Sequence, residues 1–240
     1  QNLSSDKTPV LPTNMLGNEY VVSSYKGFVA NVNSEFLIIA TEDNTLVEII
    51  PSANTKAGKP ANTLFTVSLN KGQSYQVKGA DLTDLTGSII RVNENSGSCK
   101  PIAVFSGVEC AKVPITCTAC DHLFTQCNPT STWGTEYIVV PFEGVTQFMY
   151  RILAVENNTT VTINNTTTVN LNKGTYYEVG GQNSLATISS DKPIQAIQYM
   201  QGVTCSGNGD PSMMLLNSND QFVKKLRFTV ENSAVVNKHY

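Results

Sequence analysis

The sequence lacks the features that would place a protein across a membrane or on a nucleic acid. Its 240 residues contain no apolar run of about 18 residues, the length that a membrane-spanning helix needs. They contain no run of lysine or arginine, and the formal net charge is −3, so neither nucleic acid nor an anionic lipid surface is an expected partner. What remains is a globular composition with 40% hydrophobic and 15% charged residues.

Residues that carry out catalysis are also scarce. The chain has two histidines, His122 and His239, and no G-x-S-x-G nucleophile elbow. A cysteine nucleophile would need a free thiol, but the cysteines around His122 are clustered and are expected to be oxidised. The sequence therefore predicts a protein that is not an enzyme, with no catalytic residues and no cofactor. A metal-dependent hydrolase at His122 is the weakest alternative; the side chain is expected to bond the backbone of a stapled loop.

The six cysteines are expected to form disulfides. They are even in number and five of them fall within residues 99–127, which indicates an oxidising, extracellular compartment. The disulfide candidates are Cys99, Cys110, Cys117, Cys120, Cys127 and Cys205. A zinc site is the alternative, because Cys117 and Cys120 form a C-x-x-C with His122 two residues later, but the other cysteines keep no regular spacing.

One stretch of the chain occurs twice. Residues 12–22 and 129–139 both read Pro-Thr-x-x-(Leu/Trp)-Gly-x-Glu-Tyr-x-Val, and 117 residues separate them (129 − 12). Later matches follow in the same order, such as Leu-Asn-Lys-Gly at 69–72 and at 171–174, with loops that shorten while apolar segments persist. Surface loops tolerate such deletions, so the pattern predicts an internal duplication.

The segments between the turns are typical of strands. Asn, Thr, Ser and Val are abundant, residues 64–69 alternate between apolar and polar, and Asn70-Lys71-Gly72 is a tight turn. We expect an all-β fold of tandem duplicated β-sandwich-like repeats with about seven strands each. The alternative is one larger barrel or propeller-like β domain. The expected domains are residues 1–128 (a first repeat with a cysteine-rich connecting segment), 129–217 (a second repeat) and 218–240 (the beginning of a third).

Other polar residues suggest weaker sites. Glu42 and Asp43 could offer oxygens to calcium, but the matching turn at 156–158 has one carboxylate fewer, which favours a plain hairpin turn. Five asparagines begin N-x-S/T sequons, and we expect one sugar on each overlapping pair in a eukaryotic secreted protein: Asn2, Asn157, Asn158, Asn164 and Asn165. The alternative is that Asn and Thr merely suit turns. Trp133 replaces Leu16 of the first copy, which favours packing over ligand contact.

Several motifs together resemble a known family. They are Ala40–Thr45, Lys100–Gly107, Cys120–Gln126, Ser131–Pro141 and Gly209–Leu216. Taken together, from about Leu11 to the end, the chain resembles the N-terminal domain family of IgGFc-binding protein. The resemblance implies an extracellular protein of mucus or secreted adhesive material and a Cys110–Cys120 disulfide. Cys117, Cys127 and the segment 217–221 depart from the family pattern, so the rest of the disulfide connectivity stays open.

The functional expectation is a secreted, non-enzymatic structural or adhesive module of a mucus, matrix or surface assembly. It would act through contacts with other extracellular proteins or glycans, with further repeats of the same parent chain, or with itself. The alternative is a receptor-like binding module for a defined ligand, such as immunoglobulin Fc or a glycan.

Overall fold

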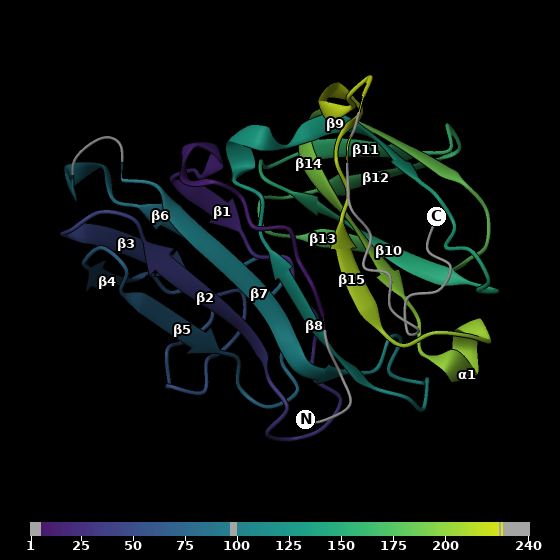
Figure 1. Cartoon of the computed structure of the whole chain (residues 1–240), viewed down its shortest axis with the longest axis horizontal. Helices are drawn as coiled ribbons and strands as arrows, with labels where there is room; N and C mark the ends of the chain where they lie inside the picture. The colour runs from purple at the N-terminus through teal and green to yellow at the C-terminus, as the bar shows by residue number, and fades with distance from the viewer. Residues whose placement is uncertain (1–5, 97–99, 226, 228–240) are drawn as a thin grey trace.

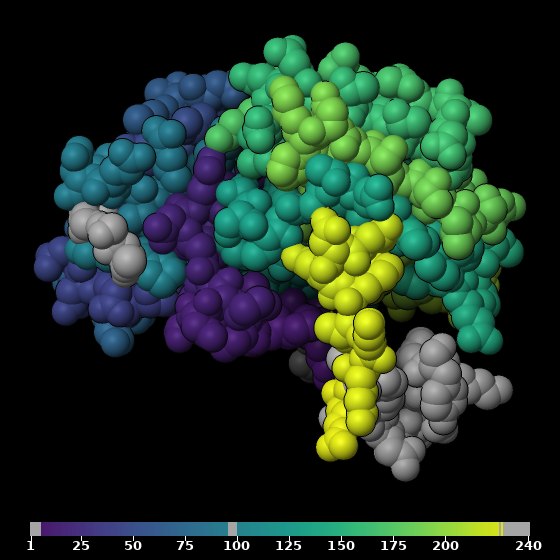
Figure 2. Space-filling view, turned by 90° about the horizontal axis from the view of Figure 1, so that it is seen from above, coloured from purple at the N-terminus to yellow at the C-terminus, as the bar shows by residue number. Residues whose placement is uncertain are grey.

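The computed structural model of this chain describes residues 6–96, 100–225 and 227, and it consists mainly of antiparallel strands (Figure 1). The prediction of an all-β fold is confirmed. We call residues 6–128 the first half and residues 129–217 the second half. Figure 2 shows the first half, in blue and teal, beside the second half, in green, with the purple N-terminal segment reaching the boundary between them.

The first half forms two four-stranded sheets that pack face to face around a core. The burial of alternate residues along β2 and β3 shows that one face of each strand points into this core. The first sheet has the order β1 (Glu19–Val21), β6 (Ile89–Val92), β3 (Thr45–Ile50), β4 (Phe65–Leu69). The second has the order β5 (Ser74–Lys78), β2 (Ser34–Ala40), β7 (Ile102–Ala111), β8 (Asp121–Gln126).

The second half repeats this order of strands. One long strand, β14 (Ala186–Met200), takes the places of both β6 and β7, so the two sheets merge into one of seven strands. Around the first part of β14 lie β9 (Gly134–Val139), β11 (Thr159–Ile163) and β12 (Thr167–Leu171). Around its second part lie β13 (Tyr176–Gln182), β10 (Phe148–Ala154) and β15 (Ser212–Leu215). The connections contain η1 (Thr13–Met15), η2 (Glu94–Ser96), η3 (Thr130–Thr132), α1 (Val203–Ser206) and η4 (Asn219–Gln221).

Equivalent tyrosines make the same hydrogen bonds in both halves. The hydroxyl of Tyr20 donates to the carbonyl of Ile102 at 2.6 Å, and that of Tyr137 donates to the carbonyl of Ile194 at 2.6 Å. Burial raises the pKa of each tyrosine to about 12, so both hydroxyls remain donors. The shared strand order and shared bonds support the duplication, which remains a proposal along with its boundaries at residues 128 and 217.

The first half has eight strands, one more than the seven expected, and the second half has seven because β14 replaces two; two of the strands were not expected. β8 lies in the cysteine-rich segment, and β15 lies in the polar stretch after β14. Both strands pair with the strand that precedes them in the chain, β8 with β7 and β15 with β14. In the described part of the chain, no helix has the length and apolar content needed to cross a membrane.

The buried apolar side chains form three clusters. One fills the first half and one fills the second half. The third lies between the halves, with Val21, Tyr25 and Leu123 from the first half packed against Leu153 and Tyr199 from the second. Trp133 joins this third cluster and is only 7% exposed, so the prediction that it serves packing is confirmed.

Candidate binding surface

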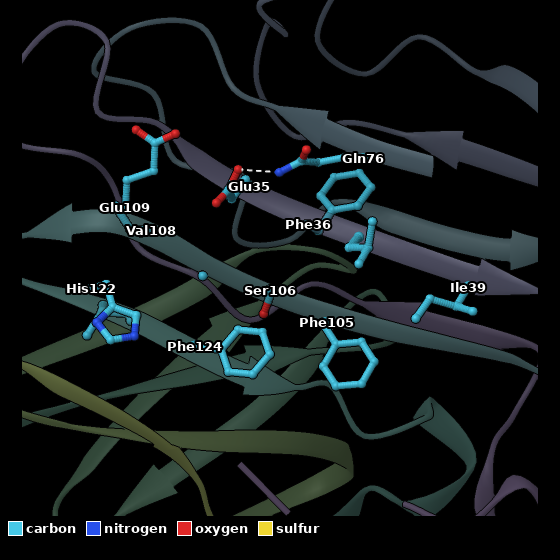
Figure 3. Close-up of a pocket in the computed structure, with 13 residues that line it drawn as sticks. Glu35, Phe36, Ile39, Gln76, Phe105, Ser106, Val108, Glu109, His122 and Phe124 are labelled. Atoms are coloured by element: carbon cyan, nitrogen blue, oxygen red, sulfur yellow. Dashed lines mark hydrogen bonds between the residues drawn. The ribbon is translucent and has the colours of Figure 1, made fainter. Parts of the chain in front are cut away.

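The outer face of the sheet β5-β2-β7-β8 carries a groove of about 430 Å³ (Figure 3). Along β2, Phe36 and Ile38 point into the core, so Leu37 and Ile39 lie on the outer face, where they are half-buried. Phe105 from β7 and Phe124 from β8 continue this apolar floor. We call this surface the outer face of the first half.

Two phenylalanines and a glycine shape the groove. The rings of Phe105 and Phe124 stack with centroids 5.7 Å apart and planes 5° apart, and Phe124 is 39% exposed. Gly107 lies opposite Phe124 in the register of β7 and β8. A Cβ atom at Gly107 would lie 1.9 Å from the carbonyl oxygen of Leu123, so only glycine lets the two strands approach here. The missing side chain also leaves the floor hollow.

Charged groups at one end of the groove satisfy one another. Gln76 Nε2 donates to Glu35 Oε2 at 2.6 Å, and Lys78 Nζ lies 3.4 Å from the same oxygen while also pairing with Glu109. The hydrogen bond to Glu109 raises the pKa of Lys78, so the ammonium stays charged. What the groove offers a partner is therefore its apolar floor.

His122 also lines the groove and lies between two carboxylates. Its Nε2 is 3.4 Å from Asp6 Oδ2, and its Nδ1 is 3.4 Å from Asp121 Oδ1. Burial raises the pKa of Asp6, although His122 opposes that shift. Both ring nitrogens of His122 therefore face carboxylates. Among the described residues, no group of three or more His, Cys, Asp or Glu side chains is placed to hold a metal ion.

Four of the cysteines form two disulfides. Cys110–Cys120 links β7 to the segment before β8, the pairing that the family resemblance implied. Cys117–Cys205 links the β7–β8 connection of the first half to α1 of the second. The zinc alternative is wrong, because Cys117 and Cys120 belong to different disulfides and have no thiolate to offer.

Cys127 was expected in a disulfide, and this prediction is wrong. It is a free thiol buried in the core of the first half, where its sulfur lies 3.3 Å from the hydroxyl of Ser106. Burial raises the pKa of this thiol, which keeps it protonated and unreactive. Cys99, Asn2 and His239 lie outside the described residues.

Glu42 and Asp43 lie in the tight turn between β2 and β3. Asp43 Oδ1 accepts the backbone N–H of Lys71 at 3.0 Å. The ammonium of Lys100 donates to the carbonyls of Asp43 and Asn44 at 3.0 and 2.9 Å. In the second half, Lys192 does the same at the carbonyls of Asn157 and Asn158. The chain's own lysines therefore supply the positive charge at both turns.

The four sequon asparagines of the second half are all exposed, but they differ in their bonding. Asn157 Oδ1 accepts the N–H of Lys173 at 3.0 Å, and Asn164 Oδ1 accepts the N–H of Thr187 at 2.8 Å. Within the described chain, the side chains of Asn158 and Asn165 make no hydrogen bond. Both have positive φ values, 54° and 55°, as asparagine tolerates in tight turns.

Sequence reasoning missed the buried arginine between the halves. Arg151 lies on β10 of the second half and is 3% exposed. Its guanidinium donates to Asp84 Oδ2 and Glu178 Oε2, both at 2.9 Å, and lies over the ring of Tyr25, 4.2 Å from the centroid. An arginine inside the apolar run Phe-Met-Tyr-Arg-Ile-Leu-Ala is the only signal that the sequence offers for this contact.

The first half supplies most of the surroundings of Arg151. The guanidinium also donates to the carbonyl of Ser24 at 3.1 Å, and Tyr199 donates to the same carbonyl at 2.8 Å. Burial by itself lowers the pKa of Arg151, but the groups around it, Tyr199 and Asp84 first, outweigh burial and raise it. A permanently charged side chain of the second half is thus held by the first half.

The outer face of the second half is therefore covered, whereas that of the first half is open. Leu37 pairs with Phe105 as Arg151 pairs with Ile197, so these pairs hold equivalent places. Gly107 pairs with Phe124 as Tyr199 pairs with Met213. The second-half residues at these places are all buried against the first half: Arg151, Ile197, Tyr199 and Met213.

Comparison with known proteins gives the following results. The family model described as "IgGFc binding protein" matches residues 6–240. The chain is similar to a human protein named IgGFc-binding protein, with 29% identity over 164 residues. That match includes 67% of this chain but only 3% of the length of the human protein. No solved structure matches the chain.

Proposed function

Because the chain belongs to the IgGFc binding protein family, we propose that it is a secreted, non-enzymatic module of a mucus, matrix or surface assembly. It acts by binding other extracellular proteins or glycans. Its two halves are duplicated units, residues 1–128 and 129–217, and residue 218 begins a third.

The open outer face of the first half carries this proposal. The groove is exposed and apolar, and the charged groups at its end pair with one another. An exposed apolar patch of this kind is typical of a surface that binds another macromolecule. The two disulfides suit an oxidising compartment. The free thiol of Cys127 is buried and protonated, so it offers no accessible nucleophile.

Adhesion to mucin tests the proposal. The protein is passed over a surface coated with purified gel-forming mucin, and binding is followed by surface plasmon resonance. We expect Phe124→Glu to weaken binding at least about tenfold, because it places a charge on the apolar floor. Leu64→Glu is the matched control, since Leu64 is 49% exposed away from the groove. Equal binding by both variants would argue against this surface.

The name of the human relative supports a second candidate, a receptor for immunoglobulin Fc. The same experiment on a surface of purified Fc separates the two. Saturable one-to-one binding to Fc, lost in Phe124→Glu, would favour the receptor. Binding to mucin without binding to Fc would favour the adhesive module.

Sugars on the second half follow from the proposed extracellular location. Asn158 and Asn165 are the preferred acceptors, because the amides of Asn157 and Asn164 already bond the backbone. Peptide mapping of the protein secreted from eukaryotic cells should find sugar on these two residues. Sugar on Asn157 or Asn164 instead would contradict this choice.

A further inference from the structure

The second half has an open side that corresponds to the side through which the first half covers its neighbour. We define the open side as the apolar residues between β9 and β15: Ile138, Val140, Phe142, Met200 and Met214. Ile138 on β9 holds the place of Val21 on β1 (138 − 21 = 117), and Met200 on β14 holds the place of Val108 on β7 (200 − 108 = 92). Val21 and Val108 both belong to the cluster between the halves.

We propose that the outer face of the first half binds the open side of the second half of another copy, so that copies associate head to tail. The contact repeats, between chains, the one that joins the two halves within a chain. This inference rests on the proposed function, because it names the protein that covers the binding surface. Such a contact uses different surfaces on its two partners, so it can continue into an open array.

The charged pair Arg151–Asp84 joins the two halves, and neither of its members has a charged counterpart on the outer face of the first half or on the open side of the second. Leu37 stands on the outer face of the first half where Arg151 stands on that of the second. Asp84, the partner of Arg151, lies in the connection between β5 and β6, residues 79–88. The corresponding connection in the second half, between β13 and β14, is only residues 183–185 and contains no acid. Docking would therefore leave neither a buried arginine nor a buried carboxylate without its partner.

The sizes of the side chains change in a complementary way. Gly107 replaces Tyr199 on the outer face, which leaves the groove hollow. On the open side, larger apolar side chains replace smaller ones at the matching places: Met200 for Val108, Met214 for Thr125 and Val140 for Ser23. Val140 is 56% exposed, although it is apolar. The open side thus carries the extra volume that the hollow face lacks.

The contact between the halves contains an ion pair, and each of the two free surfaces carries one partner of the corresponding pair. Between the halves, Lys173 Nζ lies 2.5 Å from Glu19 Oε1. Lys71 holds the place of Lys173 in the β4–β5 turn (173 − 71 = 102), and Glu136 holds the place of Glu19 (136 − 19 = 117). Both are exposed. Head-to-tail docking would bring Lys71 of one copy to Glu136 of the next.

In the head-to-tail contact, η1 of the incoming copy and η4 would compete for the same place beside Gly134. Pro129, before η3, packs on Gly17 of the first half, where a Cβ atom would lie 2.5 Å from it. Ser218, before η4, packs on Gly134 in the same way, at 2.4 Å. Residues 218–221 therefore occupy the place that η1 of the incoming copy would take, and loosening them should favour association.

Sedimentation velocity of the full chain provides the main test. We expect the weight-average sedimentation coefficient to rise with concentration up to about 1 mM, the effective concentration that a short linker gives to the contact within the chain. Phe124→Glu on the outer face and Val140→Glu on the open side should each abolish the rise. Leu64→Glu should behave as the unchanged chain. A chain that stays monomeric over the whole range would overturn the inference.

Mixing the two variants distinguishes head-to-tail from face-to-face association. Phe124→Glu keeps an intact open side and Val140→Glu keeps an intact outer face, so the mixture should form one-to-one dimers that grow no further. A mixture that remains monomeric while the unchanged chain associates would overturn the head-to-tail arrangement. It would do so even if one variant were less stable, because circular dichroism reports the fold of each variant separately.

Two more measurements sharpen the result. A carbodiimide cross-link between isotopically light and heavy copies should join Lys71 to Glu136. Gln221→Ala removes the bond from η4 to the carbonyl of Thr132 and should strengthen association severalfold. If mucin binding depends on Phe124 but the pure chain stays monomeric, this inference fails and the proposed function stands. If the pure chain associates but does not bind mucin, this inference stands and the proposed function fails.

Discussion

The outer sheet faces of the two halves share a backbone arrangement and differ in what covers them. The face of the second half carries Arg151 and Tyr199 and is buried against the first half. The face of the first half carries Leu37 and Gly107 at the same places and lies open. The same place on the sheet is thus an internal contact in the second half and an open surface in the first. Loss of the charged pair is what makes the open face compatible with an apolar partner.

Removing the disulfide between the halves is expected to have the largest effect on stability. Cys117→Ser with Cys205→Ser opens a loop of 88 residues and should lower the free energy of unfolding by about 4.5 kcal/mol on the chain-entropy estimate. Cys110→Ser with Cys120→Ser opens a loop of 10 residues within the first half and should cost about 3 kcal/mol. Chemical denaturation of both double variants checks the order. A larger loss from the second pair would show that the link between the halves contributes little.

The second-largest effect on stability is expected from exchanging the residues at the equivalent places Arg151 and Leu37. Arg151→Leu should lower the free energy of unfolding by about 3–5 kcal/mol, because Asp84, whose side chain is only 14% exposed, would lose its cation. The reverse exchange, Leu37→Arg, should change it by less than about 0.5 kcal/mol, since Leu37 is half-buried at the surface. Urea denaturation of both variants measures the difference. Equal losses would mean that the two faces have the same environment and that Arg151 is not buried against the first half.

The equivalent tyrosines should instead respond alike. Tyr20→Phe and Tyr137→Phe each remove the donor to a buried carbonyl, and each should cost about 1–2 kcal/mol. Tyr75→Phe is the control, because Tyr75 is half-buried and its hydroxyl makes no hydrogen bond in the described chain. Thermal unfolding compares the three. A loss in only one of the two tyrosines would weaken the case for equivalent halves.

Local patterns predicted the strands well. Turn residues such as Asn70-Lys71-Gly72 and the period of two along residues 64–69 depend on neighbours in the sequence. The structure has a strand at Phe65–Leu69 and a tight turn after it, although that turn leads from one sheet to the other and does not close a hairpin. β8 and β15 were missed because Asp-His-Leu-Phe-Thr-Gln and Ser-Met-Met-Leu are short and lie in polar or cysteine-rich surroundings. Pairing with β7 and β14 decides that they are strands.

The candidate surface could not be predicted in the same way. Phe105 and Leu37 read as ordinary strand residues, and whether their outward face is covered depends on how the halves pack. Arg151 meets Asp84 from 67 residues away, which no local pattern reports. Cys127 was grouped with its neighbours by spacing alone, whereas its place at the end of β8 directs it into the core. These features depend on contacts between distant segments.

Hydroxyl-radical footprinting measures the exposure of both outer faces in one experiment. In dilute protein, Phe124 should be labelled readily, whereas Tyr199 and Met213 should be protected. At high concentration, Phe124 should become protected as well, while Leu64 keeps its labelling. Equal labelling of Phe124 and Met213 in dilute protein would mean that the first half does not cover the second.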